Sequence, residues 1–146
     1  MELGLVRDSE HAEVDALVQD SGLPLDDIDH CRGTQFVARS DGKIVATAAL
    51  EIRGDDAVLR SVAVAKDRRG EHLGDQIVTY AVQEAKRLHL HGLYLLTETA
   101  EGFFPRFGFV EEPRDAAPAE IQESVEYCHV CGSHAIAMAL RLEDQQ

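Results

Sequence analysis

Residues 62–74 read VAVAKDRRGEHLG, and this stretch joins a run typical of a strand to a run typical of a helix. Three of the four residues after Ala65 are basic, and Gly70 and Gly74 follow. The first amides of a helix have no partner within the helix and lie at the positive end of its dipole, so such a junction binds phosphate. The stretch therefore predicts an anion site at the start of a helix. The alternative is a tight strand-to-helix turn without a ligand.

The sequence on either side of this junction predicts an α/β fold. Apolar residues recur with helical spacing after it, and Asp41-Gly42 before it is typical of a β-hairpin turn. We expect strands at residues 2–7, 35–39, 43–52, 57–64, 93–96, 109–112 and 135–142. We expect helices at residues 9–19 (capped by Ser9), 71–88, 97–107 and 119–126. This order predicts a twisted mixed sheet of about six to seven strands with helices on both faces, in which strand 93–96 runs parallel to strand 57–64.

The composition indicates a single domain spanning residues 1–146. Acidic residues outnumber basic ones by 27 to 14, which gives a formal net charge of −13. Such a halophile-like acidic surface argues against a nucleic-acid partner and suits a salt-rich cytoplasm. No run is apolar enough to span a membrane, and the N-terminus lacks the pattern of a secretory signal. We therefore expect a cytoplasmic protein with no membrane partner.

The junction resembles the cofactor loop of the GNAT superfamily of acetyl-CoA-dependent N-acetyltransferases. That loop has the form Arg/Gln-x-x-Gly-x-Gly/Ala after a strand that often ends in Ala-Val. Residues 62–64 fit this pattern, as do Arg69, Gly70, Leu73 and Gly74. The resemblance implies acetyl-CoA as co-substrate. It implies that its pyrophosphate is held by the amides of Arg69, Gly70, Glu71, His72, Leu73, Gly74 and Asp75. It also implies that the backbone near Val62 and Val64 pairs with the pantetheine arm and the thioester carbonyl.

One position of the junction departs from the family pattern. His72 stands where the family most often has its first glycine. The site requires that the His72 side chain point away from the phosphate, and a positive φ would be costly for this residue. Glu71 and Asp75 suit the helix dipole but oppose a phosphate, and the neighbouring basic residues offset them.

Residues 100–109, AEGFFPRFGF, resemble the second GNAT motif, a short helix with an aromatic pair followed by Gly-Phe at the start of a strand. Many members have a tyrosine at the position of Phe104, and its hydroxyl protonates the leaving thiolate. Because Phe104 has no proton to donate, we expect it to pack in the core or against the cofactor. Water then serves as the acid, or the thiolate leaves unaided. Thr97 and Thr99 could hydrogen-bond the pantetheine or the substrate, and Thr99 could instead cap the helix at Ala100.

Within the superfamily, the sequence is most similar to the small acetyltransferases associated with arsenic-resistance genes. The similarity covers residues 45–138 and does not identify an arsenical substrate. It rests on Leu50-Glu51, Gly54, Leu59-Arg60-Ser61, Val64, the junction, Thr97-x-Thr99-Ala100-x-Gly102-Phe103-Phe104, Ala116-Ala117-Pro118 and Cys131.

Glu51, Arg60 and Ser61 are the candidate catalytic residues. In direct transfer a neutral amine attacks the thioester, and a base that takes its proton adds on the order of 10²–10⁴ to the rate. Glu51 lies in an apolar strand next to the strand that ends at the junction, so it is the candidate base. Alternatively, Glu51 faces solvent or pairs with Arg60. Arg60 could hold Glu51 or bind a substrate carboxylate, and Ser61 could hydrogen-bond the substrate.

The remaining motif is Cys128-His129-Val130-Cys131 with His134. Cysteines and histidines at this spacing can hold zinc, but a single Cys-x-x-Cys pair is a weak signal, and we expect no metal. The favoured function is therefore an N-acetyltransferase that transfers acetyl from acetyl-CoA to a primary amine of a small molecule by direct attack. The alternative is a non-catalytic acyl-CoA-binding sensor or regulatory module. A homodimer is possible.

Overall fold

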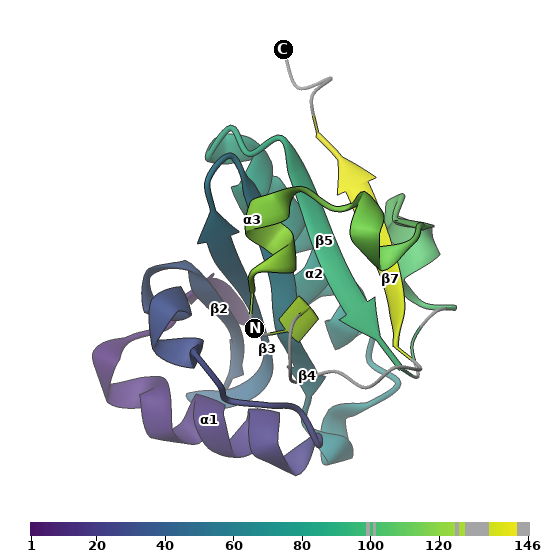
Figure 1. The fold of residues 1–146 in the computed structure, drawn as a ribbon. Coiled ribbons are helices and arrows are strands. Elements are labelled where there is room, and N and C mark those ends of the chain that lie inside the picture. Colours follow the sequence, from purple (N-terminus) through teal and green to yellow (C-terminus); the bar gives the residue numbers. More distant parts are fainter. Residues whose placement is uncertain (99, 101, 125, 128–134, 143–146) are drawn as a thin grey trace. The chain divides into compact units, whose positions relative to one another are not determined.

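The computed structural model describes residues 1–98, 100, 102–124, 126–127 and 135–142 (Figure 1). These residues group into two units. The first unit comprises Met1–Glu51 and Arg60–Glu84, and the second comprises Ile52–Leu59 and Ala85–Gln146.

Among the described residues, seven strands form one mixed sheet in the order β1-β2-β3-β4-β5-β7-β6. The strands are β1 Glu2–Leu5, β2 Gln35–Ser40, β3 Lys43–Arg53, β4 Asp56–Val64, β5 Gly92–Thr97, β6 Val110–Glu111 and β7 Ile136–Arg141. The helices are α1 His11–Asp20, α2 Leu73–Arg87 and α3 Ala119–Gln122. The short 3₁₀ segments are η1 Asp8–Glu10, η2 Ile28–Thr34, η3 Lys66–Arg68, η4 Phe104–Phe107 and η5 Arg114–Ala116. β4 and β5 pair in parallel, whereas β1–β2, β2–β3, β5–β7 and β6–β7 pair antiparallel. The predicted fold class and the predicted parallel pair are confirmed.

In the first unit, helices α1 and α2 cover opposite faces of the sheet. Val37 of β2 belongs to one apolar cluster with Val14 of α1. The ring of Phe36, the preceding residue of β2, meets the ring of Tyr80 on α2 at a centroid distance of 5.4 Å. Successive strand residues point to opposite faces, so the two helices lie on different sides. The prediction of helices on both faces is confirmed in this unit.

Helix α2 forms because its apolar stripe is buried. Leu73, Ile77, Ala81 and Ala85 are at most 3% exposed, at the spacing expected for one helix face. Full burial of a side chain as large as Ile77 contributes about 1.5–3 kcal/mol. The junction is the segment between Val64 at the end of β4 and Leu73 at the start of α2.

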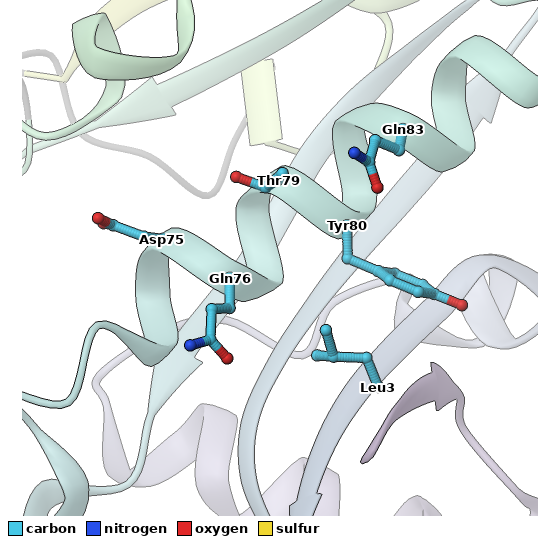
Figure 2. A pocket seen from close by; sticks show the side chains of 6 residues that line it. All are labelled: Leu3, Asp75, Gln76, Thr79, Tyr80 and Gln83. Carbon is cyan, nitrogen blue, oxygen red and sulfur yellow. The ribbon is translucent and has the colours of Figure 1, made fainter. Parts of the chain in front are cut away.

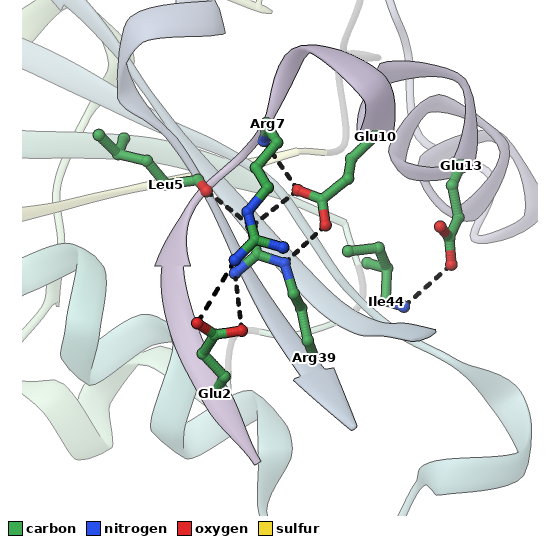
Figure 3. Close-up of polar contacts among 7 residues, drawn as sticks. All are labelled: Glu2, Leu5, Arg7, Glu10, Glu13, Arg39 and Ile44. Carbon is green, nitrogen blue, oxygen red and sulfur yellow. Dashed lines mark hydrogen bonds and ion pairs between the residues drawn. The ribbon is translucent and has the colours of Figure 1, made fainter. Parts of the chain in front are cut away.

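The entry into α1 differs from the sequence expectation. Ser9 does not begin the helix; it lies within η1, and the Arg7 amide donates to Glu10 Oε1 at 2.7 Å. Arg39 on β2 reaches the same carboxylate with two hydrogen bonds, Nε to Oε2 at 2.6 Å and Nη2 to Oε1 at 2.7 Å (Figure 3). The hydrogen bond from Arg39 lowers the pKa of Glu10 from 4.5 to about 2. A buried ion pair, rather than a hydroxyl cap, therefore ties the start of α1 to the sheet.

Two predicted turns depend on left-handed backbone. Asp41 and Gly42 have φ of 54° and 80°, as a two-residue hairpin turn between β2 and β3 requires. Gly54 has φ of 67°, and a Cβ added there would lie 2.5 Å from Glu120 Oε2. Only glycine therefore fits this second turn without displacing the Glu120 carboxylate.

The second unit has its own apolar core, and it contains less helix than the sequence predicted. Val58, Tyr94, Ile121 and Ala139 are among the buried residues of one cluster. The helix expected at residues 97–107 is wrong: among the residues of this range that the structure describes, only the 3₁₀ segment η4 forms, and it ends at Gly108 with φ of 99°. This segment packs three aromatic side chains and has no apolar stripe at helical spacing that would favour a longer helix.

None of the helices in the described ranges is both long and apolar enough to cross a bilayer.

Candidate functional site

The junction between β4 and α2 has two left-handed residues directly before the helix. Gly70 has φ of 90° and His72 has φ of 62°. Helix α2 then begins at Leu73, and the Gln76 amide donates to the His72 carbonyl at 3.2 Å. By helix geometry the amides that precede Gln76 have no intrahelical acceptor. The backbone of the junction is therefore arranged to present several N–H groups at the positive end of α2.

His72 adopts the strained backbone that the sequence analysis considered costly. A left-handed conformation costs about 1–2 kcal/mol for a residue other than glycine, although histidine adopts it more readily than most residues. Its side chain is 79% exposed, and Nδ1 lies 3.9 Å from Asp75 Oδ2. The imidazole therefore lies in solvent beside the first turn of α2.

The basic residues of the junction divide into two kinds. The side chain of Arg68 is fixed, because Nε donates to Glu71 Oε1 at 3.0 Å and Nη2 donates to Ser40 Oγ at 3.3 Å. Lys66 and Arg69 are exposed. Arg68 thus offsets the charge of Glu71, and the two exposed cations give the loop its positive character in an acidic protein.

The backbone of β4 near Val62 and Val64 points away from β3. The Ala65 amide donates to the Val45 carbonyl of β3 at 2.9 Å. Since N–H groups alternate along a strand, the amides of Val64 and Val62 point to the other edge of β4. The ladder between β4 and β5 pairs Asp56, Ala57 and Val58 with residues 92–94. In the described ladder, residues 62–64 lie beyond this pairing.

Ser61 interrupts the regular strand just before these residues. Its φ is 59°, so its backbone is left-handed in the middle of β4. The residue is 7% exposed, and its Oγ has no hydrogen-bond partner among the described residues. Strained backbone and an unsatisfied buried hydroxyl are each uncommon, and each marks candidate functional positions. The sequence offered no signal for the left-handed conformation, because serine rarely adopts it.

Glu51 and Arg60 form a buried ion pair. Arg60 Nη1 donates to Glu51 Oε1 at 2.9 Å, and the two side chains are 0% and 2% exposed. Both residues therefore lie on the same side of the sheet, as the pairing considered from the sequence requires. Arg60 Nη2 also donates to the Pro24 carbonyl at 3.4 Å. Sequence reasoning missed this contact, because nothing in the local pattern links the segment between α1 and η2 to β4.

In the second unit, Thr97 and Phe104 have structural partners. Thr97 Oγ1 accepts a hydrogen bond from the Ala100 amide at 2.9 Å, the capping role that the sequence analysis considered for Thr99. Thr99 lies outside the described residues. Phe104 is 7% exposed and makes edge-to-face contacts with Phe103 and Phe109. Its ring packs as a core aromatic, one of the two environments expected for it.

The cysteine motif cannot be placed. Cys128, His129, Cys131 and His134 lie outside the described residues. Within the described ranges, no three Cys, His, Asp or Glu side chains are grouped so that they could hold a metal ion.

Comparison with known proteins identifies the family. The sequence model of the acetyltransferase (GNAT) domain matches residues 31–111, more than half of the chain. The chain belongs to the GNAT acetyltransferase family. The matched range of this GNAT domain includes the junction, Glu51, Arg60 and Phe104.

Two relatives and one more distant structure agree with this membership. The chain is 33% identical over 99 residues to an amino-acid acetyltransferase of Mycobacterium tuberculosis (strain ATCC 25618 / H37Rv), a match that spans 67% of this chain and 53% of the relative. It is 25% identical to Rv2747 of M. tuberculosis, solved in complex with CoA and NLQ, with a TM-score of 0.81 and coverage of 97% and 99%. The fold also matches the N-acetylglutamate synthase of Neisseria gonorrhoeae, solved with coenzyme A and N-acetyl-glutamate, at 15% identity and a TM-score of 0.82 over 97% of this chain and 35% of the synthase. The chain thus spans about half the length of the curated relative.

Proposed function

We propose that this GNAT domain transfers the acetyl group of acetyl-CoA to the primary amine of a small molecule, and that this molecule is an amino acid. The amino-acid acetyltransferase among its relatives and the structure of Rv2747 with CoA support this proposal. Family membership favours an acetyltransferase over a module that binds acyl-CoA without turnover.

The observation that carries the proposal is the junction before α2. We propose that the turn at Gly70 and His72 directs the amides of residues 69–75 outward at the positive end of α2. We assign the pyrophosphate of acetyl-CoA to these amides. The exposed side chains of Lys66 and Arg69 add positive charge beside them.

The backbone beyond Ser61 is assigned to the acyl arm. The amides of Val62 and Val64 point to the edge of β4 away from β3. A strand edge of this kind pairs with an extended amide chain, as the pantetheine arm is, and one of its N–H groups can polarise the thioester carbonyl. The Ser61 hydroxyl is the nearest side-chain donor in sequence to these amides, and we assign it to the substrate. From the family resemblance we also assign Thr97 and Thr99 to the pantetheine end of the cofactor.

The reaction is direct transfer. The lone pair of the neutral amine attacks the thioester carbon, a C–N bond forms, the C–S bond breaks, and CoA leaves as the thiolate. We propose that Glu51 accepts the proton lost from the amine, and that Arg60 holds the Glu51 carboxylate in place through the hydrogen bond at 2.9 Å. With Phe104 at the position of the usual tyrosine, the thiolate takes its proton from water.

Three broader expectations remain predictions. They are the narrower similarity to acetyltransferases associated with arsenic-resistance genes, the cytoplasmic location and the action of residues 1–146 as one domain. Assays with arsenicals carrying a primary amine, cell fractionation and limited proteolysis test them in turn.

The test of the proposed function combines binding and turnover. Calorimetry in high salt should show that acetyl-CoA binds, and mass spectrometry should show acetylated products when a set of amino acids is supplied. Gly74→Leu, which adds bulk at the first turn of α2, should weaken acetyl-CoA binding on the order of tenfold or more. Gly33→Leu is the matched control, because a Cβ added at Gly33 meets nothing within 4 Å. Absence of binding at millimolar acetyl-CoA, or binding without any acetylated amine, would contradict the proposal.

A further inference from the structure

Gln35 carries a buried amide group whose nitrogen has no hydrogen-bond partner. The residue begins β2 and is 0% exposed, and its Nε2 is unpaired within the ranges that the structure describes. A primary amide has two N–H donors, and a donor that is left unpaired away from water destabilises the fold. Such donors are uncommon in native proteins, so Gln35 Nε2 is a candidate contact for a ligand.

Arg32 fixes the orientation of this amide. Arg32 Nη1 donates to Gln35 Oε1 at 2.9 Å. A guanidinium group only donates, so the oxygen of the amide faces Arg32 and the NH₂ group occupies the other end. Asp15 on α1 holds Arg32 through two further hydrogen bonds, Nη1 to Oδ1 at 3.1 Å and Nη2 to Oδ2 at 2.9 Å. The Asp15–Arg32 pair therefore holds the Gln35 side chain with its donor end free.

Gln35 lies on the same face of the sheet as Glu51. In the ladder between β2 and β3, Gln35 is directly opposite Ala49, so these two side chains share a face. Glu51 follows Ala49 by two residues along β3 and points to the same face. Gln35 and Glu51 are thus diagonal neighbours on adjacent strands, about 7–8 Å apart, a spacing within reach of long side chains. A small molecule between them can contact both.

The open groove between β1 and α2 lies on the other face of the sheet. Phe36, the residue after Gln35, points to that face and contacts Tyr80 of α2. Figure 2 shows Tyr80 and Gln83 on the α2 side of this groove, with Leu3 of β1 opposite. The groove is therefore separated from Glu51 by the sheet, and Gln83 provides a control for changes at Gln35.

The segment η2 covers the face that carries Gln35 and Glu51. Ile28 and Cys31 of η2 form one buried apolar cluster with Ala49. Glu51, the proposed base, is itself only 2% exposed. An acceptor amine reaches Glu51 only when this cover moves aside, and the same movement makes the Gln35 amide accessible.

We propose that Gln35 determines acceptor specificity, and that its Nε2 donates to the α-carboxylate of an amino acid whose amine lies at Glu51. The assignment rests on the proposed function. The amine and the carboxylate of an α-amino acid are attached to one carbon, so both fit between diagonal neighbours. Arg60, which donates to Glu51 at 2.9 Å, places a positive charge beside the incoming anion. An amine without the carboxylate leaves the buried Gln35 donor unpaired, which is how such sites reject an analogue.

Calorimetry with matched ligand pairs in the presence of CoA tests this assignment. The pairs are L-leucine with isoamylamine, L-glutamate with γ-aminobutyrate and L-arginine with agmatine, and the second member of each lacks only the α-carboxyl group. The wild type should bind the amino acid of at least one pair roughly tenfold or more tightly than its partner. Gln35→Glu keeps an oxygen that accepts from Arg32 but replaces the donor end by a carboxylate oxygen, so this preference should be lost. Gln83→Glu makes the same change in the groove and should retain it.

Gln35→Met is the second variant, because it has a similar volume without any donor or acceptor. It should weaken binding of the preferred amino acid roughly tenfold, leave the affinity for the partner amine within about twofold, and leave acetyl-CoA binding unchanged. A wild type without preference for any amino acid, an equal loss for both members of a pair, or loss of the preference in Gln83→Glu would each overturn the proposal. Turnover on the same samples reports separately on acetyl transfer: a preference that depends on Gln35, without acetylated product, would contradict the proposed function and support the role of Gln35 in binding.

Discussion

Two buried arginine–glutamate pairs lie in the first unit, and they differ in what surrounds them. Arg39 and Glu10 hold β1 and η1 against β2, and each side chain also forms a hydrogen bond with a backbone group of the same region (Figure 3). Arg60 and Glu51 lie beside Ser61, whose backbone is left-handed and whose hydroxyl has no hydrogen-bond partner in the described part of the chain. A buried charge pair alone therefore does not indicate catalysis. The strained, unsatisfied neighbour is what distinguishes the second pair.

The largest expected effect is on catalytic activity, which should depend on the Glu51–Arg60 pair and not on the Glu10–Arg39 pair. Glu51→Gln keeps an oxygen that accepts from Arg60 but cannot take a proton, so kcat should fall on the order of 10²-fold or more. Glu10→Gln, the same change in the other pair, should leave kcat of the folded enzyme nearly unchanged. Steady-state kinetics with an amino-acid acceptor measure both. Equal losses in the two variants would remove the distinction between the pairs.

The second expected effect is on stability, which should depend on the buried Arg39–Glu10 pair far more than on an exposed ion pair nearby. Arg39→Met leaves the Glu10 carboxylate without its buried partner and should lower the free energy of unfolding by about 3–5 kcal/mol. Arg7→Met removes the exposed pair with Glu2, whose atoms lie 3.5 Å apart, and should cost at most about 1 kcal/mol. Urea denaturation of both variants gives the difference. A loss below 1 kcal/mol for Arg39→Met would show that the Arg39–Glu10 pair does not anchor β1.

The third effect is the dependence of stability on pH. The pKa of Glu10 is about 2 in the folded protein against 4.5 for the ordinary side chain, because Arg39 favours the charged form. A carboxylate with a lowered pKa stabilises the fold fully above the unfolded pKa, and this contribution is lost as the pH falls from about 4.5 toward 2. The urea midpoint of the wild type should therefore decrease over that range. The decrease should be smaller in Glu10→Gln, and identical curves would contradict the assignment.

The smallest expected effect concerns the junction between β4 and α2, which follows Arg60 of the second pair along the chain. His72→Gly removes the left-handed strain at φ of 62° and should stabilise the protein by about 1 kcal/mol. His89→Gly relieves the same strain at φ of 61°, after α2, and is the matched control. Thermal unfolding should show a similar gain for both, whereas only His72→Gly should alter acetyl-CoA affinity in calorimetry. A change in affinity of equal size for His89→Gly would show that the effect does not arise at the junction.

The sequence alone predicted the helices and turns whose local pattern agrees with the tertiary structure. The stripe from Leu73 to Ala85 predicted α2, and Asp41-Gly42 predicted the turn between β2 and β3, because each depends on spacing or on backbone preference within a few residues. The segment at residues 97–107 failed as a helix, since aromatic packing and the turn at Gly108 determine its path.

The candidate residues could be named from the sequence, but their geometry could not. Glu51 and Arg60 were named from their places in neighbouring strands and the junction residues from the family resemblance, and their roles stay predictions. The bond between Arg60 and the Pro24 carbonyl and the left-handed backbone of Ser61 could not be predicted, because both arise from how distant segments meet. A strand register is a tertiary property, so the pairing of Glu51 with Arg60 stayed one of several alternatives until the structure was known.

The turn at Gly54 limits which amino-acid substitutions this position can accept. A side chain there would meet both an unfavourable backbone angle and the volume that the Glu120 carboxylate fills. The backbone angle is the larger penalty, because the Glu120 carboxylate is the end of a flexible, exposed side chain that can move aside. Saturation mutagenesis followed by selection for soluble protein should therefore favour glycine at position 54 with asparagine next, the same order as at the left-handed Gly22 and Gly42, where nothing lies within 4 Å.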